Sequence, residues 1–273
     1  MSMWTTETTD GVVVATYNNP PMNYFCAEGA QEFNKLIEEW RKPAYRAVIL
    51  TGAIPGKFIT HYSVEELLDL ASDREKMRAM GTALTSGYHG MLLRLRNLPK
   101  PVIVAMNGDT MGGGFELSLS CDIRIGQRGD HRFGLPEVKL GILPGGSGTQ
   151  RLARLIGAGR AVEFVIRSRV VRPEEALELG LVHELADDAL ARAKEIGHEI
   201  ANFPPIAVAR AKHAVYTGSD THLEAGLDIE SSAFFETMLS DDGLLAMKTY
   251  IDLPYEKRRD WIENPTNPGY KGK

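Results

Sequence analysis

The chain has 273 residues, of which 43% are hydrophobic and 25% charged, a composition that excludes disorder and a collagen-like repeat. Its 31 basic and 36 acidic residues give a formal net charge of −5, which excludes a global field for binding nucleic acid or an anionic membrane. The sequence has no apolar run of membrane-spanning length and no secretory pattern at its start, so we expect a cytoplasmic protein without nucleic-acid or membrane partners.

The spacing of the cysteines and glycines excludes several kinds of binding site. Cys26 and Cys121 lie far apart and form neither a CxxC pair nor a metal-type spacing, so we expect no disulfide framework and no metal site. The dinucleotide-binding pattern G-x-G-x-x-G and the P-loop pattern are both absent. We therefore expect no nicotinamide or P-loop chemistry.

The first third of the chain alternates between strand-like and helix-like periods. Short β-branched runs predict strands over residues 12–17 and 47–51, and apolar residues at helical spacing predict a helix over 27–40 between them. Ser63 and Glu66 form a capping box, in which each side chain accepts a hydrogen bond from the other residue's amide, so a second helix begins at residue 64. This alternation is typical of an α/β fold.

The middle of the chain continues the pattern. A longer helix is expected from about residue 73 to 98, because Pro99 disfavours its continuation. Further elements are a buried strand over 102–106, short strands over 121–125 and 131–134, a Gly/Pro-rich loop over 141–148 and a helix from 149.

The character of the sequence changes after residue 202. Phe203, Pro204 and Pro205 interrupt the chain, and the segment that follows is mostly helical to about residue 251 without a convincing strand. The tail over 258–273 contains prolines and glycines among polar residues, so we expect it to cover a surface or to fray. We place a domain boundary near Pro204.

Two acidic residues stand in motifs suited to chemistry. Gly112, Gly113 and Gly114 follow a strand and precede a helix-compatible run, so their N–H groups can approach an oxyanion, while Glu116 in the first helical turn suits a base. Glu137 ends a short strand, and burial beside Glu116 would separate the pKa values of the two carboxyl groups. Alternatively, the glycines form only a tight turn, Glu116 is an ordinary first-turn acid and Glu137 is a solvated loop carboxylate.

Three segments together resemble the crotonase (enoyl-CoA hydratase/isomerase) superfamily: residues 102–122, 133–137 and 140–151. The resemblance implies an α/β fold built as a spiral of ββα repeats, with a helical C-terminal oligomerisation region. It divides the chain into a core domain, residues 1–203, and a trimerisation domain with its tail, residues 204–273. The expected assembly is a homotrimer or a hexamer made of two trimers.

The resemblance also implies roles for individual residues. Thr60 and Gly113 would donate their N–H groups to the thioester oxygen, Glu116 would deprotonate water, and Glu137 would protonate the α-carbon. The further residues expected to contact the substrate or its CoA are Met22, His61, Tyr62, Gly112, Pro136 and Gly145. His61 and Tyr62 replace small residues usual in the family, so they are either substrate contacts, an extra acid or base, or packing residues.

The activity implied is that of an enoyl-CoA hydratase, which adds water across the 2,3 double bond of an acyl-CoA thioester. No metal or redox cofactor is expected, and coenzyme A enters only as part of the substrate. Members of the same superfamily also act as Δ3,Δ2-enoyl-CoA isomerases or as hydrolases and lyases of C–C bonds, and these alternatives share the enolate. A non-catalytic binding relative is a further alternative, although both glutamates are present.

Overall fold

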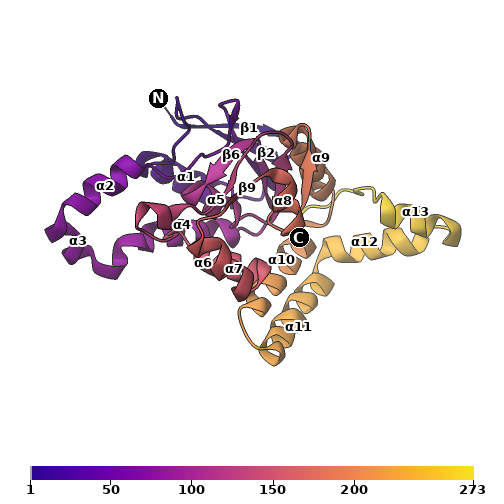
Figure 1. Ribbon diagram of the computed structural model, residues 1–273. Helices are drawn as coiled ribbons and strands as arrows, with labels where there is room; N and C mark the ends of the chain where they lie inside the picture. The colour runs from indigo at the N-terminus through magenta and orange to yellow at the C-terminus, as the bar shows by residue number, and fades with distance from the viewer. Residues whose placement is uncertain (1) are drawn as a thin grey trace.

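The computed structural model describes residues 2–273 and contains two β-sheets surrounded by helices (Figure 1). The first sheet has the order β1(Trp4–Thr9), β2(Val12–Tyr17), β3(Ala47–Gly52), β5(Val102–Met106), β7(Ile123–Gln127), β10(Glu184–Ala186). The second sheet has the order β4(Gly56–Lys57), β6(Gly108–Met111), β8(Phe133–Gly134), β9(Val170–Val171). Apart from the antiparallel pairs β1–β2 and β8–β9, neighbouring strands are parallel.

The chain alternates between these sheets as it advances. Strands β3, β5 and β7 enter the first sheet, and each is followed by a strand of the second sheet, β4, β6 or β8. The helices of this region are α1(Ala27–Glu39), α2(Val64–Ser72), α3(Arg74–Met80), α4(Ser86–Arg96), α5(Gly112–Ser118), α6(Gly148–Ile156), α7(Ala158–Ile166), α8(Pro173–Glu178) and α9(Ala189–Ala201). Two strands and a helical segment therefore form each turn of a spiral, and the predicted α/β crotonase-like class is confirmed.

The central strands are buried on both faces because their side chains alternate between two cores. Val48 and Leu50 of β3 join the larger core between the sheets, whereas Ile49 joins a smaller core beneath α9. The smaller core has space for α9 because Ala189 and Ala193 present short side chains to the strands. The period of two expected for strands thus explains why the apolar runs are continuous.

The helix expected over residues 73–98 is interrupted. α3 ends at Met80, a 3₁₀ turn occupies Gly81–Thr85, and α4 begins at Ser86. Gly81 has a φ of 53°, a left-handed conformation that glycine adopts easily and that ends a helix. The expectation of one long helix was therefore wrong.

The predicted capping box at the start of α2 forms only on one side. The Ser63 hydroxyl accepts from the Glu66 amide at 3.1 Å, and the helix begins at Val64 as expected. The Glu66 carboxylate instead accepts from the Ala27 amide at 3.0 Å and from the Tyr62 hydroxyl at 2.8 Å. Glu66 therefore joins α1 and the segment before α2, because the Ser63 amide already donates to Phe25.

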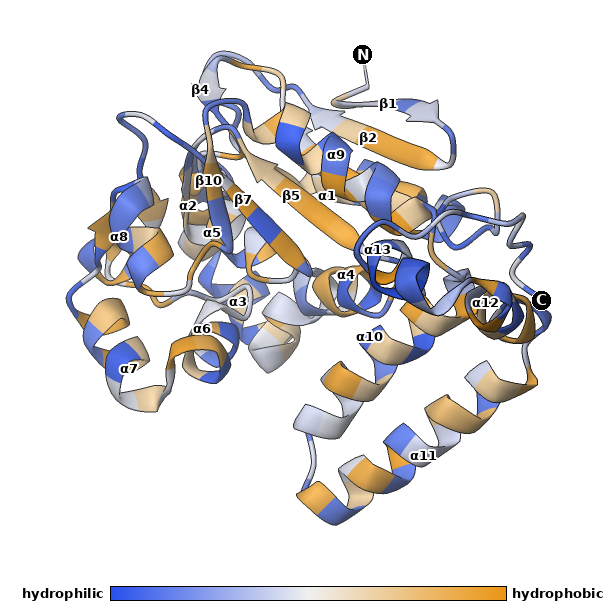
Figure 2. Ribbon diagram, turned by 90° about the vertical axis from the view of Figure 1, so that its right-hand side faces the viewer, coloured by the Kyte–Doolittle hydropathy of each residue, from blue (hydrophilic) through white to orange (hydrophobic). Residues whose placement is uncertain are grey.

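Beyond β10 and α9 the chain is helical. The helices are α10(Pro205–Ser219), α11(Leu223–Leu239), α12(Asp241–Asp252) and α13(Arg258–Glu263), with a 3₁₀ turn at Tyr255–Lys257. In Figure 1, α11 to α13 extend away from the sheets, and Figure 2 shows apolar residues spread along α10 and α11, whereas α13 is mostly hydrophilic. The division into domains at residue 204 stays a prediction.

The C-terminal tail returns to the body of the protein. The Asp242 carboxylate accepts from the Lys271 amide at 2.8 Å and from the Gly272 amide at 2.5 Å, and Tyr270 is 8% exposed. The tail is thus held on the surface instead of fraying. Among the described residues, no helix combines the length and apolar character needed to cross a bilayer.

Candidate active site

Glu116 lies in α5 and is 3% exposed. Because α5 begins at Gly112, Glu116 is its fifth residue, and the expectation that it occupies the first turn was wrong. Its Oε1 instead accepts from two amides at the start of α6, Gly146 at 2.8 Å and Gly148 at 2.7 Å. The helix end that stabilises the carboxylate therefore belongs to α6.

Burial raises the pKa of Glu116 from 4.5 to about 7. The two amide hydrogen bonds from Gly148 and Gly146 oppose this shift, as does the positive charge of Arg151. Near neutral pH a substantial fraction of Glu116 is therefore ionised, and the ionised carboxylate is basic enough to accept a proton from a neighbouring group. Glu116 thus suits a general base.

Glu137 begins a 3₁₀ turn, Glu137–Leu140, directly after β8. It is 8% exposed, and its Oε2 has no hydrogen-bond partner among the described residues. Burial raises the pKa of Glu137 from 4.5 to about 8, and the charge of Glu116 raises it further in the same direction. The two carboxyl groups therefore interact, and Glu137 is the one that stays protonated at neutral pH.

The expectation that Thr60 donates its N–H to a substrate was wrong. That N–H donates to the carbonyl of Asn23 at 3.3 Å, and the Thr60 hydroxyl donates to the carbonyl of Met22 at 2.5 Å. Both donors of Thr60 are therefore engaged within the protein.

The neighbouring amide of Tyr62 faces the predicted site instead. The carbonyl of His61 accepts from Phe25 at 2.8 Å, and because N–H and C=O point in opposite directions across a trans peptide, the Tyr62 N–H points away from Phe25. The Tyr62 nitrogen lies 3.4 Å from the position that a Cβ on Gly113 would take. The second residue of α5, Gly113, has no intrahelical partner for its own N–H.

Two glycines allow α5 to approach this segment so closely. A Cβ on Gly114 would overlap the carbonyl oxygen of Ile59, so only glycine permits the contact. Gly112 has a φ of 48°, and a Cβ there would lie 2.9 Å from Glu137 Oε1. Gly112 is thus required by the backbone conformation and by the space beside Glu137.

Tyr88 of α4 joins the site, although no sequence pattern indicated it. Its hydroxyl donates to the Gly113 carbonyl at 2.8 Å, and its ring lies 6.0 Å from the ring of Tyr62. Burial raises the pKa of Tyr88 well above its ordinary value, and the charges of Glu116 and Glu137 act in the same direction. A lone tyrosine on a helix gives no signal before the tertiary contacts are known.

The other residues expected to contact substrate have varied positions. Met22 is 37% exposed, and the His61 ring stacks on Tyr24 at a centroid distance of 4.1 Å. Pro136 directly precedes Glu137, and the carbonyl of Gly145 contacts His89 Nε2 at 2.7 Å. Their roles stay predictions.

The site can thus combine two hydrogen-bond donors with an acid and a base. The Tyr62 nitrogen lies close to Gly113, Glu137 Oε1 lies against the adjacent Gly112, and Glu116 interacts with Glu137 through its charge. Such donors stabilise an oxygen that gains negative charge in a reaction, and the two carboxyl groups can move protons to and from neighbouring atoms. Within residues 2–273, no three or more His, Cys, Asp or Glu side chains form a group that could hold a metal ion.

The fold and site together define a class of protein. A crystal structure of enoyl-CoA hydratase from Bacillus anthracis is similar to this chain with a TM-score of 0.84 and 32% sequence identity, covering 99% of this chain and 100% of that one. The family model of enoyl-CoA hydratase/isomerase matches residues 7–263. The chain belongs to the enoyl-CoA hydratase/isomerase family, as its sequence motifs indicated.

Two further relatives show the range of similarity. The short-chain-enoyl-CoA hydratase of Clostridium acetobutylicum is 36% identical over 246 residues, which cover 88% of this chain and 91% of that protein. The mitochondrial methylglutaconyl-CoA hydratase of Mus musculus is 35% identical over 213 residues, covering 74% of this chain and 65% of that protein.

Proposed function

We propose that this chain is an enoyl-CoA hydratase, a hydro-lyase that adds water across the 2,3 double bond of an acyl-CoA thioester. The observation that carries the proposal is the pair of buried, interacting carboxyl groups with pKa values of about 7 for Glu116 and about 8 for Glu137. Adding water requires a base for the water and an acid for the α-carbon, and such a pair supplies both near neutral pH. The hydratases among the relatives support the same reaction.

In the proposed mechanism, the thioester oxygen accepts hydrogen bonds from the N–H groups of Tyr62 and Gly113. Attack of water at the β-carbon moves negative charge onto that oxygen, and the two amides stabilise the resulting enolate. Removing one such donor in an acyl-transfer enzyme costs about 100- to 1,000-fold in rate. Tyr62 therefore replaces Thr60 as the first donor, because its N–H is directed away from Phe25.

The two glutamates then divide the proton transfers. Glu116 removes a proton from water as the water oxygen bonds to the β-carbon, and Glu137 gives its proton to the α-carbon of the enolate. The unpartnered Oε2 of Glu137 supports this role, because a buried carboxyl oxygen without a partner can carry the proton to be donated. The N–H of Gly145 assists by holding the water beside Glu116. The reaction leaves Glu116 protonated and Glu137 ionised, and the starting state returns when Glu116 releases one proton to solvent and Glu137 takes one up.

A short acyl chain is the proposed substrate class. The Tyr88 ring packs against Gly146, because a Cβ on that glycine would lie 2.5 Å from Tyr88 Cε1. The Tyr62 ring lies next to the Tyr88 ring. Two aromatic rings beside the catalytic carboxyl groups leave little space for a long chain. The name of the clostridial relative agrees with this proposal.

The decisive experiment is hydration of crotonyl-CoA, followed by the loss of absorbance of the conjugated thioester. Glu116→Gln and Glu137→Gln are each expected to lower kcat by about 100- to 10,000-fold. Glu178→Gln, which changes an exposed residue of α8, is the matched control and should keep the wild-type rate. Turnover that persists in the double variant would remove the assignment of acid and base, and a 3-enoyl product or a cleaved C–C bond would identify an isomerase or a hydrolase instead.

We also propose that no metal or redox cofactor takes part, and that coenzyme A enters only with the substrate. The rate should therefore be unchanged after dialysis against a chelator. A rate that falls and returns with added divalent metal would contradict this expectation.

The exposed apolar side chains of the C-terminal helices support assembly into a homotrimer or a hexamer of two trimers. The members with 48–73% of their surface exposed are Leu223, Leu227, Phe234, Phe235, Met238, Leu239, Leu244 and Ile251. Apolar area of this kind along neighbouring helices is typical of a protein interface. Light scattering should give the mass of three or six chains for the wild type and a smaller mass for Phe234→Asp with Leu239→Asp. A wild-type mass of one chain would overturn the proposal.

A further inference from the structure

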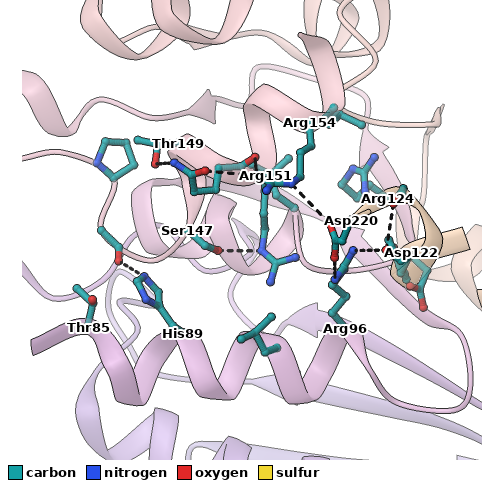
Figure 3. Close-up of a pocket in the computed structure, with 18 of the residues that line it drawn as sticks. Thr85, His89, Arg96, Asp122, Arg124, Ser147, Thr149, Arg151, Arg154 and Asp220 are labelled. Atoms are coloured by element: carbon teal, nitrogen blue, oxygen red, sulfur yellow. Dashed lines mark hydrogen bonds and ion pairs between the residues drawn. The ribbon is translucent and has the colours of Figure 1, made fainter. Parts of the chain in front are cut away.

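A cavity lies beside the loop over residues 143–147, whose Gly146 amide donates to Glu116. It has a volume of about 830 Å³ and is bounded by α4, α6 and α10 (Figure 3). Neither Glu116 nor Glu137 lines it, whereas Gly145 and Ser147 of the loop do. A volume of this size falls within the usual range for small-molecule sites and is far larger than a single water needs.

The charges that line this cavity are unbalanced. Four arginines line it, Arg96, Arg124, Arg151 and Arg154, but only two aspartates, Asp122 and Asp220. Asp122 is already paired with Lys212 at 2.7 Å, outside the lining. The cavity therefore has an excess of positive charge, in contrast to the negative charge of the whole chain.

Asp220 is shared by two of the arginines. It forms an ion pair with Arg96 at 2.8 Å and a longer one with Arg154 at 3.6 Å. Arg124 is buried and donates to the carbonyls of Leu181 and Cys121, at 2.7 and 3.0 Å. These groups are thus largely satisfied within the protein.

Arg151 is the exception. Its Nε donates to the Ser147 hydroxyl at 2.8 Å, and its two terminal nitrogens have no partner among residues 2–273. Figure 3 shows its guanidinium group directed into the cavity between Ser147 and Arg96. Burial, first, and the charge of Arg96 lower the pKa of Arg151, and the charge of Asp220 opposes this shift without forming a direct ion pair with Arg151.

We propose that this cavity binds a small oxyanion, a carboxylate or phosphate group, at the terminal nitrogens of Arg151, with the charge of the neighbouring Arg96 adding to the attraction. The Arg151 guanidinium presents a planar pair of N–H donors that matches two oxygens of such an anion, whereas Arg96 already donates to Asp220 at 2.8 Å and to the Tyr216 carbonyl at 3.2 Å. The bound anion compensates the charge of Arg151 and the repulsion between the two arginines. The site lies outside the pair of catalytic carboxyl groups, although the charge of Arg151 also lowers the pKa of Glu116.

The test is isothermal titration of the full-length protein with inorganic phosphate, and in a second series with succinate, both at constant ionic strength. Wild-type protein should show saturable binding of one anion per chain for at least one of the two, and the preferred anion distinguishes a phosphate from a carboxylate site. Arg151→Gln should weaken this binding about 10-fold or more, because a charge-assisted pair of hydrogen bonds is lost. Arg160→Gln, which removes an exposed arginine of α7 outside the cavity, should leave it unchanged.

Two results would overturn the proposal: no saturable binding of either anion to the wild type, or equal binding by wild type and Arg151→Gln. If Arg151→Gln does not fold, Arg151→Lys keeps the charge but loses the paired donors, and it should still bind several-fold more weakly than the wild type. Unchanged affinity in Arg151→Lys would count against the assigned donors in the same way.

Discussion

Replacing Glu137 by glutamine should remove activity and, at alkaline pH, increase stability. The Glu137 carboxyl group is buried, its Oε2 has no hydrogen-bond partner within residues 2–273, and its pKa is raised from 4.5 to about 8. A glutamine of nearly the same shape carries no charge into the same environment. The variant should therefore be free of the electrostatic cost that the ionised carboxylate imposes on the folded state.

The dependence on pH follows from the direction of the shift. Below about pH 4.5 the carboxyl group is protonated in both the folded and the unfolded chain, so it does not lower the free energy of unfolding. Between about pH 4.5 and 8 only the unfolded chain releases the proton, and the free energy of unfolding falls as the pH rises. Above about pH 8 both forms are ionised, and the full cost is present.

The pKa shift of Glu137 also sets an upper limit on the gain in the free energy of unfolding. Each pKa unit corresponds to about 1.4 kcal/mol, so the rise from 4.5 to about 8 gives an upper limit of roughly 5 kcal/mol. Part of that rise comes from the charge of Glu116, so a gain of about 2–4 kcal/mol is expected for the variant at pH 9. For a chain of 273 residues, this gain corresponds to an increase in Tm of about 3–7 °C.

Thermal unfolding at pH 5 and pH 9 measures this difference, with Glu178→Gln as the control for loss of one negative charge. Glu137→Gln should exceed the wild-type Tm clearly at pH 9 and little at pH 5, whereas the control should show no such dependence. An increase that is equal at both pH values, or equal to that of the control, would refute the argument from burial.

Three further predictions concern activity toward crotonyl-CoA. Gly146→Ala should lower kcat by about 100-fold, because the added Cβ would overlap Glu116 Oε2 and the Tyr88 ring. The control Gly159→Ala should keep the wild-type kcat, because its Cβ would have no neighbour within 4 Å among the described residues. Similar rates for the two variants would contradict the proposed contact. The pH profile of kcat/KM should rise with ionisation of Glu116 near pH 7 and fall with deprotonation of Glu137 near pH 8, and a rate that falls neither below pH 7 nor above pH 8 would exclude the pair. Tyr88→Phe should lower kcat about 5- to 10-fold through loss of the hydrogen bond to Gly113, and an unchanged kcat would show that this bond does not position the site.

Much of the fold could be predicted because the central strands carry strong local signals. The strands over 12–17 and 102–106 were placed at their observed bounds, since β-branched and apolar residues fill both faces of a parallel sheet. The strand Trp4–Thr9 was missed, because only Trp4 of its six residues is buried and the rest are polar. Its pairing with β2 is set by the tertiary structure and not by a local pattern.

The donor amide could not be placed correctly from the sequence. Every residue except proline has a backbone N–H, so the residue type does not identify the donor. In an extended segment, N–H groups one residue apart point in opposite directions, so the donor must be assigned to the right residue. Here the segment from Thr60 to Tyr62 is fixed by hydrogen bonds to Asn23 and Phe25, some 35 residues away. Only those bonds show that the Thr60 amide faces the protein and the Tyr62 amide does not.

The roles of the two glutamates depend on an equally distant contact. Glu116 is more deeply buried than Glu137, 3% exposed against 8%, so burial alone would give it the higher pKa. The reverse order, about 7 against about 8, arises because the Gly148 and Gly146 amides and the charge of Arg151 oppose the rise at Glu116, whereas the charge of Glu116 adds to the rise at Glu137. The start of α6, 30 residues further along the chain, therefore determines which carboxyl group acts as the base. No local feature of residues 112–118 contains that information.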